Sequence, residues 1–255
     1  MKILAITNQK GGVGKTTTCV NLAASLAANG KKVLLVDLDP QGNASTGSGI
    51  DKARLKYSIY HVLINDKKFD EIIVKSEKGG FDVAPSNREL AGAEVELVNE
   101  LARETRLKQA ITKLANSYDY VLLDCPPALN LVTVNALTAA NTVMIPMQCE
   151  YYALEGLSDL VNTIKKVRAH LNPTLEIEGL LRTMFDTRNM LAQQVSAQLE
   201  SHFGNKVYKT VIPRNIRLAE APSYGLPVLF YDKTSKGAVA YLQLAEEIIK
   251  KQKLN

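Results

Sequence analysis

Residues 9 to 17 carry the clearest chemical pattern in this sequence, Gln-Lys-Gly-Gly-Val-Gly-Lys-Thr-Thr. They follow a short apolar run at residues 3 to 6 and precede a helical pattern that starts near Thr17. A strand, a glycine-rich loop and a helix in this order are typical of a phosphate-binding loop. The glycines let backbone N–H groups approach phosphate oxygens, and the helix N-terminus adds partial positive charge. We expect Lys15 to contact the β- and γ-phosphates and the Thr16 hydroxyl to bind Mg²⁺.

The loop departs from the common pattern G-x-x-x-x-G-K-[ST], because Gln9 stands where that pattern has glycine and Lys10 adds a second lysine. The resulting K-G-G-x-G-K-T pattern resembles the deviant Walker A loop of the ParA/MinD family of ATPases. The resemblance implies ATP and Mg²⁺ as cofactors. It also implies that Lys10 crosses the interface of an ATP-bound homodimer and acts with Lys15 in catalysis. The implied nucleotide-binding residues are Lys10, Gly11, Gly12, Val13, Gly14, Lys15, Thr16 and Thr17.

Carboxylates follow two further apolar runs. Asp37 and Asp39 end the run at residues 33 to 36, and Asp124 ends the run at residues 121 to 123. Ligands of doubly wound sheets bind at the carboxyl ends of the strands, so these side chains should lie near the loop. Asp124 has the pattern of a Walker B carboxylate, which holds Mg²⁺ directly or through water. The run D-x-D-P-Q-G-N resembles the first switch of the family, which implies that Asp39 orients or deprotonates the attacking water and that Asp37 supports the Mg²⁺ shell.

A late segment narrows the resemblance. The run I-P-R-N-x-R-L-x-E-A-P at residues 212 to 222 resembles chromosomal, Soj-like ParA ATPases, and the resemblance extends from Ile3 to Leu244. It implies that Pro213 and Asn215 border the adenine. It also implies non-specific binding of double-stranded DNA by basic residues of the C-terminal half. Arg188 is the first choice, and the other candidates are Arg182, Lys209, Arg217 and Lys236.

The function implied is that of a Mg²⁺-dependent ATPase that forms an ATP-sandwich dimer and drives chromosome or plasmid partitioning. A ParB-type centromere-binding partner would stimulate hydrolysis. The alternative is a membrane-cycling, MinD-like positioning ATPase, which needs an amphipathic last helix to lie on lipid. The spacing of Val239, Leu242, Ala245 and Ile249 predicts instead that this helix packs on the sheet, so no membrane partner is expected. An electron carrier would need paired cysteines, and an ATP-dependent ligase stays open although no substrate signature is evident.

The composition is consistent with these expectations but does not by itself imply them. The chain has 255 residues, of which 46% are hydrophobic and 22% charged, and a net charge of +5 that permits an anionic partner. Cys19, Cys125 and Cys149 are scattered and lack a C-x-x-C pair, which indicates reduced thiols. No signal-peptide layout is present at the N-terminus. We therefore expect a cytoplasmic, nucleoid-associated protein.

The elements that must position these residues alternate along the chain. Continuous apolar runs predict strands buried on both faces, with helical patterns between them. This alternation predicts an α/β fold, a doubly wound and mainly parallel sheet with helices on both faces, in a single domain of residues 1–255. Residues 40 to 80 are less regular. The expected strands are 3–7, 33–36, 120–123, 143–145, 178–181 and 207–212, and the expected helices are 17–29, 89–115, 131–140, 154–170, 190–203 and 237–251.

Overall fold

The structure is a computed structural model that describes residues 1–114 and 117–254, the side chains of residues 154, 155, 253 and 254 excepted. One seven-stranded sheet has the order β3-β4-β2-β5-β1-β6-β7. All neighbouring strands are parallel except β3 and β4, so the predicted fold class is confirmed. The strands are β1 (Lys2–Ile6), β2 (Val33–Asp37), β3 (Val74–Ser76), β4 (Phe81–Ala84), β5 (Tyr120–Asp124), β6 (Thr142–Met147) and β7 (Glu176–Arg182).

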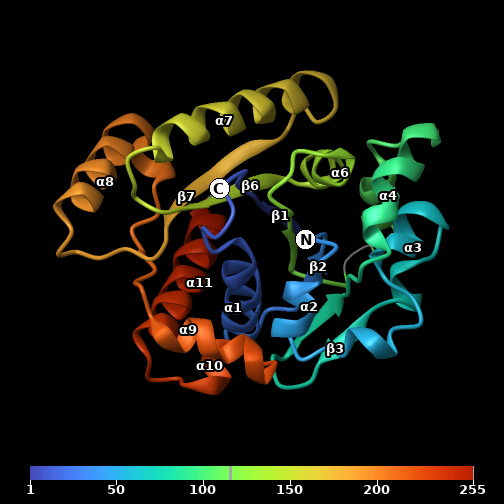
Figure 1. The fold of residues 1–255 in the computed structure, drawn as a ribbon, viewed down its shortest axis with the longest axis horizontal. Helices are drawn as coiled ribbons and strands as arrows, with labels where there is room; N and C mark the ends of the chain where they lie inside the picture. Colours follow the sequence, from blue (N-terminus) through green and yellow to red (C-terminus); the bar gives the residue numbers. More distant parts are fainter. Residues whose placement is uncertain (115–116, 255) are drawn as a thin grey trace.

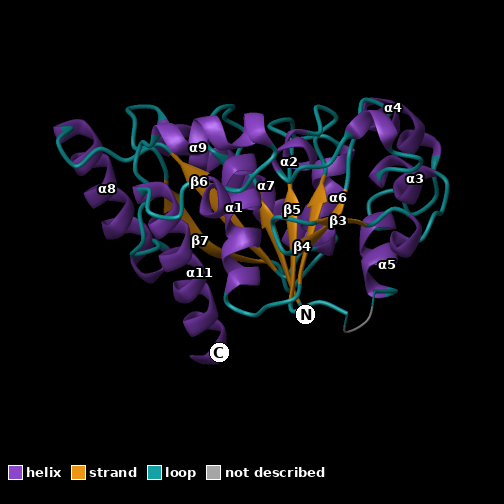
Figure 2. Cartoon of the chain, turned by 90° about the horizontal axis from the view of Figure 1, so that it is seen from below, coloured by secondary structure: helices purple, strands orange, loops and turns teal. Residues whose placement is uncertain are grey.

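Helices cover both faces of this sheet (Figures 1 and 2). On one face α1 (Lys15–Ala28) lies against α11 (Lys236–Leu254). Near them are the short helices α2 (Asn43–Gly47), α9 (Ile216–Glu220) and α10 (Val228–Tyr231). The other helices belong to the opposite face and to the β3 edge: α3 (Ile59–Ile64), α4 (Leu90–Glu96), α5 (Arg106–Thr112), α6 (Leu131–Ala139), α7 (Ala153–His170) and α8 (Met190–Phe203).

The central strand β5 shows why the strands read as unbroken apolar runs. Val121 and Leu123 belong to the core on the α6 side, whereas Tyr120 and Leu122 belong to the core on the α1 side. Side chains alternate across a strand, so a strand covered on both faces needs apolar residues at every position. Burying each such side chain contributes roughly 1.5–3 kcal/mol, which fixes the strand in register and leaves Asp124 at its end.

Three expectations about the elements were wrong. Residues 74–84 form an antiparallel edge hairpin, where no strand was predicted. Residues 207–212 run beside β7 and are not a strand, because they make only the isolated bridge of Leu180 with Val207, and Glu247 accepts the N–H groups of Lys209 and Thr210. The helix expected over 89–115 is broken between α4 and α5, where Ala102 has a left-handed φ of 55°. Its predicted end at Ala115 lies outside the described residues.

The last helix packs on the sheet side as expected, but with a shifted face. Val239, which was predicted to be buried, is 42% exposed, while Ala238, Tyr241, Leu244 and Ile248 are buried beside α1. Ala245 is buried as the spacing predicted. Within the described residues, we find no helix with the length and apolar character needed to cross a membrane.

Candidate active site

The sheet register brings the predicted functional residues to one edge. Ile6 at the end of β1 pairs with Asp124 at the end of β5, and Asp124 pairs on its other side with Asp37 at the end of β2. The loop that leaves β1 therefore lies beside both carboxylates, and α1 begins at Lys15 directly after it. The three segments that the sequence marked meet at the carboxyl ends of adjacent parallel strands, where this class of sheet binds ligands.

The backbone of this loop has the form that an anion site needs. Gly12 has φ 73° and Gly14, the N-cap of α1, has φ 87°, values that residues with a side chain adopt only at a cost. A Cβ atom added at Gly11 or Gly12 would meet no described atom within 4 Å, so open space faces the loop. The N–H groups of the first turn of a helix have no partner within the helix. Phosphate oxygens in that space would accept hydrogen bonds from them.

The two lysines of the loop have different surroundings. Lys15 is buried, and its Nζ donates to the Lys10 carbonyl oxygen at 3.0 Å, which holds the ammonium beneath the loop. Burial lowers the pKa of Lys15, and the charges of Asp124 and Asp39 oppose this shift. Lys10 is half exposed, and its Nζ lies 2.5 Å from Glu150 Oε2. Lys10 is therefore held by a carboxylate that follows β6, whereas Lys15 is held by the loop itself.

Asp124 and Thr16 form the candidate metal site. Thr16 Oγ1 donates to Asp124 Oδ2 at 2.8 Å, while Asp124 Oδ1 is buried without an N–H or O–H donor in the described part of the chain. An unsatisfied buried oxygen costs about 1–3 kcal/mol, more when it is charged, and a cation would remove this cost. Burial and the nearby charge of Asp37 raise the pKa of Asp124.

These donors fit Mg²⁺ better than a metal held wholly by protein. Mg²⁺ prefers oxygen ligands and keeps several waters, so it needs only one or two protein oxygens besides the nucleotide phosphates. Thr16 Oγ1 and Asp124 supply such oxygens. In the described ranges, no group of three or more His, Cys, Asp or Glu residues could enclose an ion by itself. The residues present therefore fit a magnesium ion that is bound together with a nucleotide.

Asp37, which ends β2 next to the Thr16–Asp124 pair, and Asp39, just after the strand, differ in burial and in hydrogen bonding. Asp37 is fully buried, and its Oδ2 accepts from Ser45 N at 2.8 Å and from Ser45 Oγ at 2.7 Å. Its Oδ1 accepts from Asp39 N at 3.2 Å, so both oxygens are engaged and Asp37 suits support of a metal shell. Asp39 is only partly buried, and its Oδ1 accepts from Gln41 N at 2.9 Å.

A cavity of about 380 Å³ adjoins the loop and contains the two residues predicted to border adenine. Gly14 and Thr17 form one wall, and Pro213 and Asn215 line it from a segment almost 200 positions farther along the chain. Asn215 also caps α9, because its Oδ1 accepts from Leu218 N at 3.3 Å. The volume lies in the range of ordinary small-ligand sites. The structure thus brings the phosphate loop and the predicted base contacts together.

Comparisons with known proteins agree with this geometry. The family model described as "AAA domain" matches residues 1–177. The sporulation initiation inhibitor protein Soj of Bacillus subtilis is 56% identical over 247 residues, which cover 97% of this chain and 98% of that protein. The chromosome partitioning protein ParA of Caulobacter vibrioides is 52% identical over 255 residues, 99% of this chain and 96% of that protein. This chain belongs to the ParA/Soj family of chromosome-partitioning ATPases.

A solved structure with a bound nucleotide has the same fold as this ParA/Soj chain. Cobyrinic acid a,c-diamide synthase from Mycobacterium smegmatis, with bound ADP and magnesium, superimposes with a TM-score of 0.87 at 37% identity. The match covers 99% of this chain and 96% of that one. The predicted family membership is therefore confirmed, and a fold of this kind is known with a nucleotide and magnesium bound.

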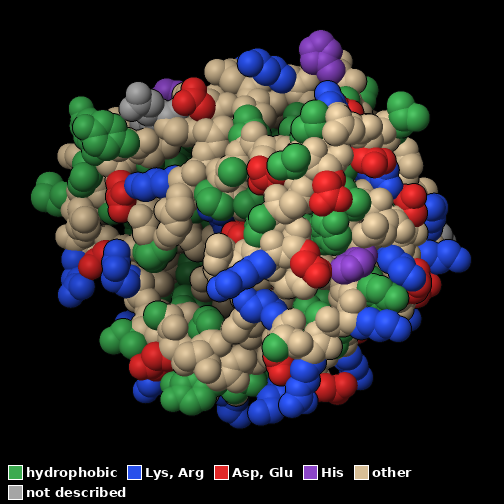
Figure 3. Space-filling model, turned by 45° about the vertical axis from the view of Figure 1, so that its right-hand side comes forward, with side chains coloured by type: hydrophobic (Ala, Val, Ile, Leu, Met, Phe, Trp, Pro, Cys, Tyr) green, Lys and Arg blue, Asp and Glu red, His purple; other side chains and the backbone are tan. Residues whose placement is uncertain are grey.

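The predicted DNA-contact residues of the ParA/Soj chain do not all reach its surface. Arg188 is exposed but forms a two-bond pair with Asp186, and Arg217 is half exposed beside Glu220 and Asp232. Lys209 and Lys236 are exposed. In Figure 3 the Lys and Arg side chains are mixed with Asp and Glu over the visible face and gather along its lower edge.

Arg182 is a correction to this set. Its guanidinium is buried, donates to Ser196 Oγ and Tyr208 O at 2.7 Å each, and is paired with Glu200. These contacts tie β7 to α8, so Arg182 has a structural role and no access to a DNA phosphate. Sequence reasoning saw only an arginine at the end of a strand and could not tell that its partners would cover it.

Sequence reasoning also missed three residues that shape the site. Thr183 Oγ1 donates to the Val13 carbonyl oxygen at 2.8 Å and so fixes the loop to the end of β7. Ser45 holds Asp37, and Glu150 holds Lys10. None of the three belongs to a spacing rule for phosphate loops.

Proposed function

We propose that this ParA/Soj-type ATPase binds ATP with its phosphates on the loop of residues 10–17 and its base in the cavity of Pro213 and Asn215. The observation that carries the proposal is the Thr16–Asp124 pair, in which Asp124 Oδ1 is buried and accepts no N–H or O–H from the described residues, next to the strand that leads into the glycine loop. Bound Mg²⁺ would offset negative charge on the phosphates. Thr16 and Asp124 would hold it, and Asp37 would support them.

The residues have separate tasks in hydrolysis. Lys15, fixed beneath the loop, binds the β- and γ-phosphates. Asp39 orients the attacking water or takes its proton, because it is the carboxylate of this edge that is neither fully buried nor bonded through both oxygens. Lys10 leaves Glu150 and contacts the phosphates of a partner subunit, since its side chain is half exposed and does not share the buried position of Lys15. The ATP-bound form is therefore a homodimer.

The cycle that follows is chromosome or plasmid partitioning. The ATP dimer binds double-stranded DNA without sequence preference through Arg188, Arg217, Lys209 and Lys236, which places it on the nucleoid in the cytoplasm. A ParB-type partner stimulates hydrolysis and releases the dimer. One sheet holds strands from residue 2 to residue 182, and we propose that the whole chain of 255 residues acts as a single domain.

A second candidate is an ATP-dependent ligase, which the likeness to the M. smegmatis synthase favours. Sequence identity to this chain distinguishes the two candidate functions: that synthase is 37% identical to it, whereas Soj and ParA are 56% and 52% identical. We therefore prefer the partition ATPase. Phosphate release without any small acid present would support it, and release that requires such an acid would support the ligase.

The test compares two single lysine variants. Lys15→Ala removes the buried cation of the loop and should abolish tight ATP binding and all turnover. Lys32→Ala removes an equally charged but exposed lysine just before β2, outside the loop, and should bind ATP like the parent. Binding is measured by equilibrium dialysis, and turnover by phosphate release with and without DNA and the partner. Unchanged ATP binding by Lys15→Ala would show that the loop does not hold the phosphates.

A further inference from the structure

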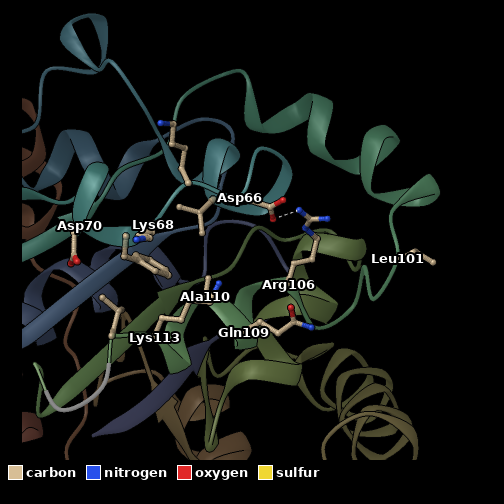
Figure 4. A pocket seen from close by; sticks show the side chains of 12 residues that line it. Asp66, Lys68, Asp70, Leu101, Arg106, Gln109, Ala110 and Lys113 are labelled. Atoms are coloured by element: carbon tan, nitrogen blue, oxygen red, sulfur yellow. Dashed lines mark hydrogen bonds and ion pairs between the residues drawn. The ribbon is translucent and has the colours of Figure 1, made fainter.

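A second hollow, of about 450 Å³, lies between the segment that follows α3 and helix α5 (Figure 4). Residues 62–70 and 101–114 enclose it. It shares no lining residue with the cavity beside Gly14. Neither the phosphate loop nor any predicted DNA contact lines this hollow. The proposed ATPase cycle therefore does not use it.

Its floor is part of the hydrophobic core. Val62, Phe69 and Leu114 line the hollow but are only 3%, 2% and 6% exposed, and all three belong to the core cluster on that side. Since the surrounding core already holds these side chains, the floor keeps its shape without a ligand. A preformed hollow is typical of a small-molecule site, because binding then costs little reorganisation.

Arg106 ties together the walls of the hollow. Its guanidinium, 12% exposed, lies 2.5 Å from Asp66 Oδ1 and 2.6 Å from Glu100 Oε2, and so joins α5 to the two loops beside it. Asp66 and Ala102 in these loops have left-handed φ values of 54° and 55°. Backbone strain that the surrounding contacts maintain is typical of ligand sites. The walls are therefore held in place rather than free to collapse.

The unpaired charges around the hollow favour an anion. Lys68 and Lys113 line it, and within the described part of the chain neither ammonium has a hydrogen bond or an ion pair. Lys67 is paired with Glu71 and Asp66 with Arg106, which leaves Asp70 as the one unpaired carboxylate against two ammonium groups. Figure 4 shows Lys68 and Lys113 on the side of the hollow opposite Arg106 and Asp66. A ligand could thus place an apolar body on the floor and an acidic group near the lysines.

We propose that this hollow is an accessory site for a small amphipathic anion, a compact aromatic or aliphatic body that carries a sulfonate, carboxylate or phosphate. The volume is in the range of small-molecule pockets. The packed floor fixes the shape of the hollow, and Lys68 and Lys113 select the charge. The site is separate from the nucleotide site, and both can be filled at once.

The experiment uses the fluorescent anion 1-anilinonaphthalene-8-sulfonate, titrated into the full chain with and without saturating Mg²⁺ and ADP. We expect one saturable site that persists when ADP is present. Lys68→Gln/Lys113→Gln should bind the probe about tenfold more weakly, as expected for the removal of two partly solvated charges that face the anion. Lys75→Gln/Lys78→Gln removes the same charge from exposed lysines outside the hollow and should bind like the parent.

A third variant tests the volume of the hollow without changing charge. Ala110→Leu fills the hollow from α5 with a good helix former, so it should abolish probe binding while the thermal unfolding curve keeps its midpoint. N-phenyl-1-naphthylamine has the same aromatic body without the sulfonate. It should bind more weakly than the anionic probe, and its affinity should not change in the Lys68→Gln/Lys113→Gln variant. Full displacement of the anionic probe by ADP would overturn the proposal. So would equal affinity for both double variants, or unchanged binding by Ala110→Leu.

Discussion

At the scale of single residues, the carboxylates of Asp37, Asp39 and Asp124 differ in what already occupies their oxygens. Both oxygens of Asp37 accept hydrogen bonds from protein donors, and one oxygen of Asp124 accepts from Thr16. Asp39 is the least buried of the three. A group that must meet water and reacting atoms has to be accessible, so we propose that Asp39 acts in hydrolysis and that Asp37 gives structural support.

Asp39→Ala should therefore separate nucleotide binding from hydrolysis. Lys15, Thr16 and Asp124 remain, so ATP and Mg²⁺ should still bind and the ATP-bound dimer should accumulate. Turnover should fall by about 10²-fold or more, the usual contribution of a positioned general base. Size-exclusion chromatography with ATP and a phosphate-release assay measure the two effects. Monomer alone in the column, or unchanged turnover, would contradict this role.

The same scale shows what sequence could and could not supply. Lys15, Thr16 and Asp124 were predictable because strand, loop and helix order fixes where each must lie once β1 and β5 pair. The partners of Arg182 and Lys10 were not predictable. Glu200 and Glu150 come from other segments of the chain, and no spacing of residues near Arg182 or Lys10 indicates them. Contacts between remote segments depend on packing, which a pattern of residue types does not specify.

At the scale of elements, the end of β7 links the phosphate loop to the segment that carries Arg188. Thr183 donates to Val13 of the loop, and Phe185 forms an isolated bridge with Pro213 on the wall of the base cavity. Between them Met184 has a left-handed φ of 49°, so the backbone turns sharply at this point. A change in the loop on nucleotide binding would therefore reach the segment at 185–188 through Thr183.

This link predicts a measurable loss of communication. The chain contains no Trp, so Phe185→Trp provides a single fluorescent reporter in that segment. Its emission should change when Mg²⁺ and ATP bind, and Thr183→Val, which is similar in size but cannot donate, should reduce that change. ATP affinity should drop only a few-fold, since one neutral hydrogen bond contributes ~1 kcal/mol. Thr187→Val, an exposed change in the same segment, serves as the control. An unaltered signal in Thr183→Val would exclude the link.

Most elements of this fold were predictable, and two of the exceptions show what an apolar pattern does not report. Central strands such as β5 are apolar throughout because both faces are covered. The edge strand β3, Val-Lys-Ser, has two exposed residues of three, so it lacks that signal. Residues 207–212 have strand-like composition, yet Glu247 of α11 takes two of their N–H groups in place of a neighbouring strand. The spacing of apolar residues indicates which positions are buried. It does not predict a strand correctly where a side chain, and not a neighbouring strand, accepts the backbone N–H groups.

At the scale of the whole molecule, the two arginines proposed to contact DNA are both paired with acids. Arg188 lies beside Asp186 and Arg217 beside Glu220, so each adds little net positive charge to the surface that one subunit offers DNA. Non-specific affinity is the sum of many phosphate contacts, and a dimer doubles their number on one particle. Once the first subunit is bound, contacts of the second become intramolecular, which raises affinity without new chemistry. DNA binding should therefore require the ATP dimer.

Arg188→Ala tests both the surface and the mechanism. It should weaken binding to any sequence about equally and reduce the slope of log affinity against log salt by about 1 for each phosphate that the protein no longer neutralises. Arg54→Ala is a matched control, because Arg54 is also 88% exposed and paired with a nearby aspartate. Filter binding across a salt series, with ATP, with ADP and without nucleotide, gives the answer. Equal binding in the three nucleotide states would refute the need for a dimer. A salt-insensitive affinity would refute phosphate contacts, and the same weakening in Arg54→Ala would mean that Arg188 is not part of a specific DNA surface.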